Sequence, residues 1–331
     1  MEKHQDKTID VSIIIANYKS WKVLDKCISS IKSNLKDLSY EVIVVDNCSN
    51  DGIFENFKSM HSWINLLSNK GNYGYSSASN LGASKARGDF LIFLNPDTEI
   101  TNSPAINKMV ELAKKDPQQG IISCRKIKPG NRIEREITFL SPWLTIGFIR
   151  YVYKVVFKKK IKNLFKESEM IWNPEWLTGS IFLISSRNFE LVGGLPEKDY
   201  WMYYEEMDLA QRVKKIGKKI TLLRDVEILH QHGGSSRINP KTSAITKSEV
   251  MISRYVYIQK FYSNNSNKYL MYFLFTLISL VDQIIKALIS IPFFWLRRPR
   301  ASILLLFESL KYFLNAFLRK SWKSNRLEPK L

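Results

Sequence analysis

Three apolar runs stand out in the first hundred residues, and each of them ends in polar residues. The runs are VSIIIA (11–16), VIVV (42–45) and FLIFL (90–94). Their β-branched and aromatic content, with a helical pattern from about Lys22 to Leu35 after the first run, predicts a βαβ unit in a buried parallel sheet. The residues that follow the runs are Asn17, Asp46 with Asn47, and Asn95 with Asp97. Because ligands of open α/β sheets bind beyond the carboxyl ends of the strands, the pattern predicts a pocket there.

The pattern in residues 176–236 predicts further strands and a helix that begins with acidic residues. Residues 176–197 predict a strand, the start of a helix and a Gly-Gly turn, and residues 226–236 predict a final strand. Between them, residues 200–220 begin with aromatic and acidic residues and continue as a basic helix. Favourable interaction with the helix dipole would by itself explain acids in the first turn of that helix, here Glu205, Glu206 and Asp208. Similarly, the loop from Asp46 to Gly52 could be a plain turn and helix cap.

Composition narrows the class of protein. The 331 residues carry 50 Lys and Arg against 31 Asp and Glu, and this net charge of +19 indicates a polyanionic partner: nucleic acid, an anionic membrane or phosphorylated substrates. Three cysteines without a CxxC pair suggest neither a disulfide framework nor a zinc site. The polar first ten residues lack a signal-peptide core, so we expect the catalytic part to stay inside the cell.

Two parts of the chain suggest contact with a membrane. Residues 137–166 contain seven basic residues and no acid, among many aromatics. In residues 269–296 the uninterrupted apolar stretch ends at Val281, short of the roughly 20 residues that cross a bilayer. A polar stripe that includes Asp282, Gln283 and Lys286 predicts an amphipathic helix on the membrane surface, and residues 301–320 repeat the design. A true span and a homodimer interface are the alternatives.

Seven segments in order resemble family-2 glycosyltransferases of the GT-A fold, and most of all their rhamnosyltransferase-like branch. The segments are VSIIIANYKS, EVIVVDNCSNDG, NKGNYGYSSASNLGASKARGDF, FLNPDT, WLTGSIFLI, YYEEMDLAQR and HQHGGSS, within residues 10–237. The resemblance implies an α/β, Rossmann-like nucleotide-sugar-binding domain with a central, mostly parallel sheet over residues 1–240. Residues 10–100 would form its nucleotide-binding half and residues 101–240 its acceptor and catalytic half. Residues 241–331 would form C-terminal amphipathic, membrane-associated helices.

The resemblance also assigns a donor site. Asp97 matches the last acid of the D-x-D motif, which together with His230 would hold Mg²⁺ or Mn²⁺ against the donor diphosphate; His232 is kept in reserve. The first acid of the motif is replaced by Asn95, which keeps a hydrogen-bonding group for the ribose but gives up a charge. Asp46 would accept the N3–H of uracil or thymine, with Asn17 nearby. The other donor-site candidates in the matched segments are Asn47, Asp51, Asn80, Trp176 and Gly179. Arg87 and Lys70, the basic residues of the glycine-punctuated loop, would contact the diphosphate, with an exposed surface charge as the alternative for Lys70.

The implied reaction is an inverting sugar transfer. Glu206 matches the family's general base, and Asp208 is grouped with it as catalytic. The donor would be a UDP- or dTDP-sugar, with rhamnose as one candidate sugar. The acceptor would be a lipid-linked saccharide of surface polysaccharide assembly, used at the cytoplasmic face of an anionic membrane.

Other classes of function fit less well. No nucleic-acid-binding motif accompanies the charge, and no G-x-G-x-x-G follows the first strand as an oxidoreductase would require. A nucleotidyltransferase would carry a basic glycine-rich loop at that point. A non-catalytic partner protein that binds nucleotide-sugars is the remaining alternative.

Overall fold

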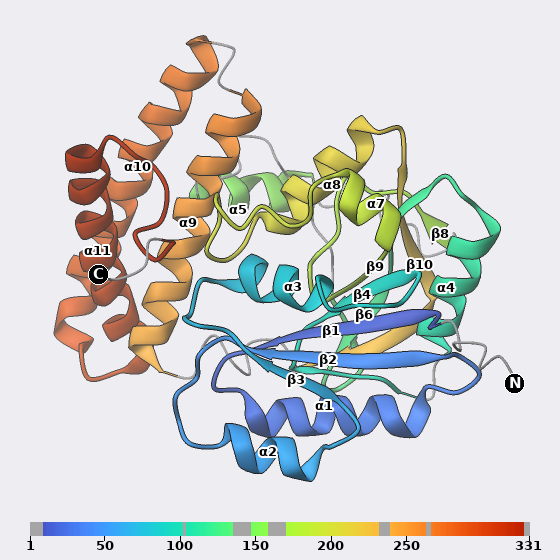
Figure 1. The fold of residues 1–331 in the computed structure, drawn as a ribbon. Helices are drawn as coiled ribbons and strands as arrows, with labels where there is room; N and C mark the ends of the chain where they lie inside the picture. The colour runs from blue at the N-terminus through green and yellow to red at the C-terminus, as the bar shows by residue number, and fades with distance from the viewer. Residues whose placement is uncertain are drawn as a thin grey trace, which may run out of the picture.

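The computed structural model describes residues 9–101, 104–134, 147–157, 170–231, 239–262 and 266–327. Figure 1 shows a central sheet with helices on both faces and the C-terminal helices grouped at one side. The strands are β1 (Val11–Asn17), β2 (Tyr40–Asp46), β3 (Asn65–Ser68), β4 (Phe90–Leu94), β5 (Thr98–Glu99), β6 (Gln119–Lys128), β7 (Arg132–Ile133), β8 (Ile171–Trp172), β9 (Ile181–Ser185) and β10 (Lys219–His230). The helices are α1 (Trp21–Asn34), α2 (Phe54–Met60), α3 (Tyr75–Ala83), α4 (Ala105–Lys115), α5 (Gly147–Val156), α7 (Ser186–Leu191), α8 (Glu205–Lys215), α9 (Pro240–Tyr262), α10 (Ser266–Ser290), the 3₁₀ helix η2 (Ile291–Phe293) and α11 (Arg297–Arg319).

The three apolar runs form β1, β2 and β4, and the predicted helix between the first two is α1, so this βαβ unit is confirmed. The sheet has the order β3-β2-β1-β4-β9-β6-β10-β5, with β7 beside β6 and β8 beside β10. It is mixed, which corrects the prediction of a mostly parallel sheet, because β9 runs antiparallel to both β4 and β6. A fully buried strand reads as an apolar run in either direction, so the sequence pattern did not carry this information.

Each face of the sheet is covered by a separate apolar layer. On one face, side chains of α1 and α4 such as Leu24, Ile28 and Met109 pack against β1, β2 and β4. On the other face, α7 and α8 contribute Phe189 and Leu209. Figure 1 shows α1 and α2 on one side of the sheet and α3, α7 and α8 on the other. Burial on both faces explains why these strands lack polar alternation.

The C-terminal helices pack on the α/β part of the chain. Val256 and Tyr257 of α9 form a buried cluster with Tyr200 and Met207. The next layer joins α9 to α11, where Met251 packs near Tyr312. Both predicted C-terminal helices are therefore present, as α10 and α11, and α9 precedes them as their link to the sheet domain.

Candidate active site

The polar residues predicted to surround a pocket do gather at one edge of the sheet. Asn17 and Asp46 are aligned neighbours at the ends of β1 and β2. β9 is antiparallel to β4, so Gly179 just before β9 lies at the edge where Asn95 follows β4, and the backbone N–H of Asn95 donates to the Ser180 carbonyl (2.9 Å). His230 ends β10, also at this edge.

The loops after β1 and β2 are held by buried hydrogen bonds. The Asn17 side-chain amide donates to Asp46 (2.9 Å), and Ser49 donates to the same carboxylate through its backbone N–H (2.9 Å) and its hydroxyl (2.5 Å). Asn47 donates to Asn72 and to the carbonyl of Gly74, and it accepts from Asn69. Asp46 and Asn17 thus present a fixed polar edge, while Asn47 joins this loop to the segment after β3.

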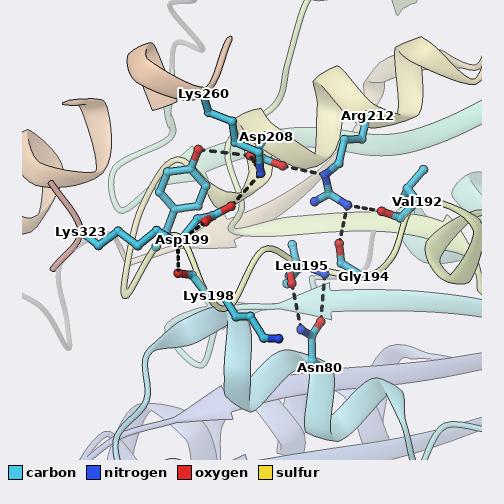
Figure 2. Close-up of polar contacts among 11 residues, drawn as sticks. Asn80, Val192, Gly194, Leu195, Lys198, Asp199, Asp208, Arg212, Lys260 and Lys323 are labelled. Atoms are coloured by element: carbon cyan, nitrogen blue, oxygen red, sulfur yellow. Dashed lines mark hydrogen bonds and ion pairs between the residues drawn. The ribbon is translucent and has the colours of Figure 1, made fainter. Parts of the chain in front are cut away.

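Three donor-site candidates make other contacts. Asp51 is exposed, accepts from the Trp21 indole (2.9 Å) and holds the turn before α2, as the plain-turn alternative proposed. Asn80 bonds the backbone of Leu195 (Figure 2) and also the side chain of Glu197, and so ties α3 to the segment that precedes α8. The structure gives both of these residues a structural role.

Arg87 corrects the sequence prediction. It precedes β4 and its guanidinium pairs with Glu41 at 2.9 Å, while its backbone N–H reaches Ser12 near the start of β1. These residues mark the amino-terminal edge of the parallel strands, opposite to Asn17 and Asp46. Arg87 is therefore too remote to contact a diphosphate at the carboxyl edge.

The predicted metal residues do come together. Asp97 and His230 are both buried, with 3.5 Å between the Asp97 carboxylate and His230 Nε2, and Nδ1 of the same ring lies 2.8 Å from Glu134. Burial lowers the pKa of His230, but the two carboxylates outweigh it and raise the pKa to about 9. Within the described residues, no group of three or more His, Cys, Asp or Glu residues is arranged to hold a metal ion.

Glu206 is the second residue of α8, and its side chain lies beside Gly179. The preceding residues Tyr203 and Tyr204 both adopt φ of 70°, a left-handed conformation that non-glycine residues adopt only where the surroundings enforce it. A Cβ atom added to Gly179 would lie 3.4 Å from Glu206 Oε1, an ordinary van der Waals contact, so the Glu206 carboxylate lies directly beside this glycine. Glu206 Oε2 is buried without a hydrogen-bond partner among the described residues.

The electrostatic setting of Glu206 suits proton transfer. Burial raises the pKa of Glu206, opposed by its own backbone N–H, by that of Gly179 and by the charge of Lys126. Burial, together with the charge of Glu206, raises the pKa of neighbouring Glu205 well above its ordinary value. A general base works best when its pKa lies near the working pH, and a raised glutamate pKa moves in that direction.

Lys126 is a site residue that the sequence patterns did not reveal. It is 1% exposed near the end of β6, and its ammonium donates to Thr178 (2.7 Å) beside Gly179. Burial lowers the pKa of Lys126 to about 8, against the raising effects of Cys124, Glu134 and Glu206. A lysine interrupting the apolar run GIISC-R-K-I was the available signal.

Asp208, predicted as catalytic with Glu206, has a structural role. It is fully buried, accepts from the Tyr200 hydroxyl (3.1 Å) and pairs with Arg212 (2.6 Å) and Lys260 (2.7 Å). Arg212 also donates to the carbonyls of Val192 and Gly194, so this Asp208 cluster joins α8, the Gly-Gly turn and α9 (Figure 2). Asp208 follows Glu206 by two residues, and on a helix such neighbours point to different sides.

Two further candidates have simpler outcomes. Trp176 is half-buried between two apolar clusters, and its indole N–H has no hydrogen-bond partner among the described residues, which leaves it available to a ligand. His232 and the glycines after it lie outside the described residues.

Comparison with known proteins places this fold and site in a class. A solved mannosyltransferase of Pyrobaculum calidifontis, in complex with GDP-Man and Mn²⁺, superposes with a TM-score of 0.50 at 18% identity, covering 76% of this chain and 64% of that one. The structure of GalNAc-T7 with UDP, GalNAc and Mn²⁺ also gives a TM-score of 0.50, at 16% identity over 67% of this chain and 43% of that chain. The fold is thus GT-A-like. Residues 12–172 match the model of Glycosyl transferase family 2, the family that the sequence motifs resemble.

Curated relatives agree with the family. An uncharacterized protein of Sinorhizobium fredii is 23% identical over 68% of this chain, and an O-antigen biosynthesis protein of Myxococcus xanthus is 22% identical over 76%. The chain spans 25% and 19% of the lengths of these two proteins. An N-acetylglucosaminyl-diphospho-decaprenol L-rhamnosyltransferase of Mycobacterium tuberculosis is 24% identical over 69% of this chain and 78% of that protein.

Proposed function

We propose that this chain is an inverting glycosyltransferase that moves a sugar, with rhamnose as the first candidate, from a UDP- or dTDP-sugar to a hydroxyl of a lipid-linked saccharide. One observation carries the mechanism. Glu206 is half-buried and has a raised pKa, its oxygen Oε2 is buried without a hydrogen-bond partner among the described residues, and it lies against Gly179 at the sheet edge that also holds Asp46 and Asp97.

Glu206 acts as the general base. The acceptor hydroxyl oxygen attacks the anomeric carbon while its proton passes to the Glu206 carboxylate, and the bond from that carbon to the diphosphate oxygen breaks with its electron pair remaining on the diphosphate. Attack on the face opposite the leaving group inverts the configuration. Lys126, buried nearby, opposes the rise in the pKa of Glu206 and so favours the carboxylate that accepts the proton.

Asp46 recognises the base of the donor. A carboxylate has about four lone-pair sites, and the three hydrogen bonds from Asn17 and Ser49 leave about one for an imide N–H. Uracil and thymine offer this group, which supports UDP and dTDP as the nucleotides. The fixed position of the carboxylate lowers the entropic cost of binding.

The Asp97 and His230 pair fits a divalent cation of the Mg²⁺ or Mn²⁺ type. A carboxylate oxygen and an imidazole nitrogen approach each other in a buried corner of the site, and imidazole together with carboxylate favours Mn²⁺ over Mg²⁺. A cation held there would neutralise charge on the leaving diphosphate. The protein's own part is to hold the ligands in place, and Glu134 does this for His230 by its contact with Nδ1.

The C-terminal helices support a position on a membrane surface. Nine apolar side chains among the described residues of α10 are exposed: Leu270, Leu274, Leu277, Ile278, Val281, Ile284, Ile285, Leu288 and Ile289. The connection to α11 adds Phe294 and Trp295, next to Arg298 and Arg300. Apolar patches of this extent mark interaction surfaces, and nearby cations favour anionic lipid headgroups.

The packing of α10 and α11 favours an orientation along the membrane surface over one that crosses the bilayer. α11 is long and apolar enough to cross a membrane by length and composition alone, with 17% of its most apolar window buried. Its Ser309 and Tyr312, however, are buried in the protein, and Gln283 of α10 contacts Met251 of α9. A monotopic enzyme on the cytoplasmic face would reach lipid-linked acceptors, the class named by the M. tuberculosis relative.

The reaction is tested with a panel of radiolabelled UDP- and dTDP-sugars, membranes as the source of lipid acceptor, and Mg²⁺ or Mn²⁺. We expect transfer by the wild type with at least one donor and its loss in Asp97→Ala and in Glu206→Gln. Turnover that survives both substitutions would reject the mechanism.

Membrane binding is tested separately by flotation with vesicles of neutral or anionic lipid. We expect the full chain to float with anionic vesicles and a Phe294→Glu, Trp295→Glu double variant to float less. Equal flotation of both proteins would show that this surface is not the membrane contact.

A further inference from the structure

A cavity of about 710 Å³ lies between the nucleotide-binding loops and the C-terminal helices. Its volume is in the range of sites that hold small molecules, ~300–1,000 Å³. One wall comes from the loops that follow the first strands of the sheet: Tyr18 after β1, Cys48 and Asn50 after β2, and residues 70–73 after β3. Trp201 also lines it.

The second wall is made by a part of the chain outside residues 12–172, the range matched by the family model. α9 contributes Glu249, α11 contributes Glu308 and Lys311, and the segment after α11 contributes residues 324–326. The nucleotide-binding loops and the C-terminal region therefore face each other across one space.

The segment after α11 is fixed in place by specific contacts. Tyr312 donates to the carbonyl of Trp322 (2.7 Å), Lys323 pairs with Asp199 (2.8 Å; Figure 2), and Ser324 donates to Glu249 (3.0 Å). These bonds connect it to α11, to the turn before α8 and to α9. Such a segment can shape a binding site without first becoming ordered.

Glu249 and Arg326 form the polar centre of this wall. Glu249 is 2% exposed, and its Oε1 lies 3.2 Å from Arg326 Nε, while Oε2 has no hydrogen-bond partner among the described residues. The Arg326 guanidinium also lies over the ring of Trp201 at 5.4 Å. In the part of the chain that the structure describes, its two Nη groups have no partner, so they are available to a ligand in the cavity.

The charges around the cavity favour an anion. Lys70, Lys311 and Arg326 line it against Glu249 and Glu308. The Arg326 guanidinium is held by Glu249 at Nε and by the ring of Trp201. Its two Nη groups can still donate a pair of hydrogen bonds, and paired donors of this kind suit a phosphate group. An anion that also reaches the loops after β1 and β2 matches a nucleoside diphosphate.

We propose that the C-terminal segment 324–326 closes the donor site, with Arg326 binding the diphosphate of the nucleotide and Glu249 positioning that arginine. This rests on the proposed function, because it takes the nucleotide-sugar as the ligand. It makes the C-terminal region a part of the donor site as well as a membrane surface.

The test is calorimetric titration of the full chain with UDP, dTDP and uridine. Arg326→Ala should weaken UDP and dTDP binding about tenfold or more, as expected for a lost charged hydrogen bond, and leave uridine affinity unchanged. Arg326→Lys should lose less, because it keeps the charge but not the paired donors. Lys320→Asn is the matched control: it removes one cation nearby, at a position with φ of 52° that Asn tolerates, and should bind like the wild type.

Melting temperatures of all variants show whether the fold is kept. UDP binding by Arg326→Ala within twofold of wild type, or an equal loss for UDP and uridine, would overturn the assignment of Arg326. Wild-type protein that binds neither UDP nor dTDP would instead reject the donor class of the proposed function, and this inference with it.

Discussion

Glu206 and Asp208 lie two residues apart on one helix turn and belong to the same motif, yet their surroundings differ completely. Glu206 has a buried oxygen without a partner among the described residues and a pKa raised by burial. Asp208 is fully buried as well, but it is neutralised by Arg212 and Lys260 and bonded by Tyr200.

The difference shows that burial alone does not make an acid reactive. Pairing with Arg212 and Lys260 makes Asp208 a link between α8 and α9, whereas the pKa of Glu206 stays raised by burial despite the opposing charge of Lys126. A sequence motif places both acids, and only the partners that other segments bring decide which of them can take a proton. The following variants separate the two roles.

Replacing Glu206 should have the largest effect. Glu206→Gln keeps the shape of the side chain but removes the proton acceptor, so kcat should fall by about 10²–10⁴-fold while UDP affinity stays near that of the wild type. Single-turnover kinetics and UDP titration measure the two quantities. A variant that loses UDP binding and keeps its rate at saturating donor would place Glu206 in donor recognition.

Replacing Asp208 should unfold the protein more readily. Asp208→Asn removes the buried charge that pairs with Arg212 and Lys260, whose side chains are 20% and 35% exposed, and the loss of these charged hydrogen bonds should cost about 1–3 kcal/mol of unfolding free energy. Urea unfolding measures it. Asp282→Asn breaks the exposed Asp282–Lys286 pair and serves as the control, with an expected change of at most ~0.5 kcal/mol. If Asp208→Asn and Asp282→Asn lowered the unfolding free energy by the same small amount, Asp208 would not have the structural role assigned to it.

Glu249 is an intermediate case, because it has cationic and hydroxyl partners and still carries a pKa raised by burial to about 7. The folded protein keeps this proton up to about pH 7, while the unfolded chain releases it near 4.5, so wild-type stability falls as pH rises between these values. Glu249→Gln has no proton to lose. Relative to wild type it should gain up to ~3 kcal/mol between pH 4 and pH 8, at ~1.4 kcal/mol per pKa unit.

Thermal or urea unfolding of both proteins across this pH range checks the prediction. A difference that does not change with pH would mean that Glu249 has the same pKa in the folded and unfolded states, and that Ser324 and Arg326 fully offset the effect of burial on it.

Arg87 should show the smallest effect. Its side chain is 71% exposed and pairs with Glu41 at the edge away from the site, so Arg87→Ala should cost at most ~1 kcal/mol in stability and leave kcat and donor KM within about twofold. Steady-state kinetics measures this. A tenfold rise in donor KM would restore Arg87 to the diphosphate site.

The sequence predicted those features that depend on the local pattern of apolar and polar residues. The apolar runs located β1, β2 and β4, and their polar ends placed Asn17, Asp46 and Asp97 at one edge. The reversal of β9 was not predictable, since it depends on how distant segments pair.

Residue roles that depend on contacts between distant segments were also missed. Asp208 meets Lys260 of α9, fifty-two residues along the chain, and Asn80 meets Leu195 across the gap between α3 and the Gly-Gly turn. Lys126 was overlooked because its position in an apolar strand shows burial only once Thr178 and Glu206 are placed beside it.

The most direct test of the account is the pH dependence of kcat in the wild type and in Asp208→Asn. It is measured at saturating donor, within the pH range in which both proteins stay folded. The account predicts that the rate rises with pH through an apparent pKa above the ordinary glutamate value of 4.5, and that this limb is the same in both proteins. A limb at or below 4.5, or one that disappears when Asp208 is replaced, would contradict the assignment of Glu206 as the base.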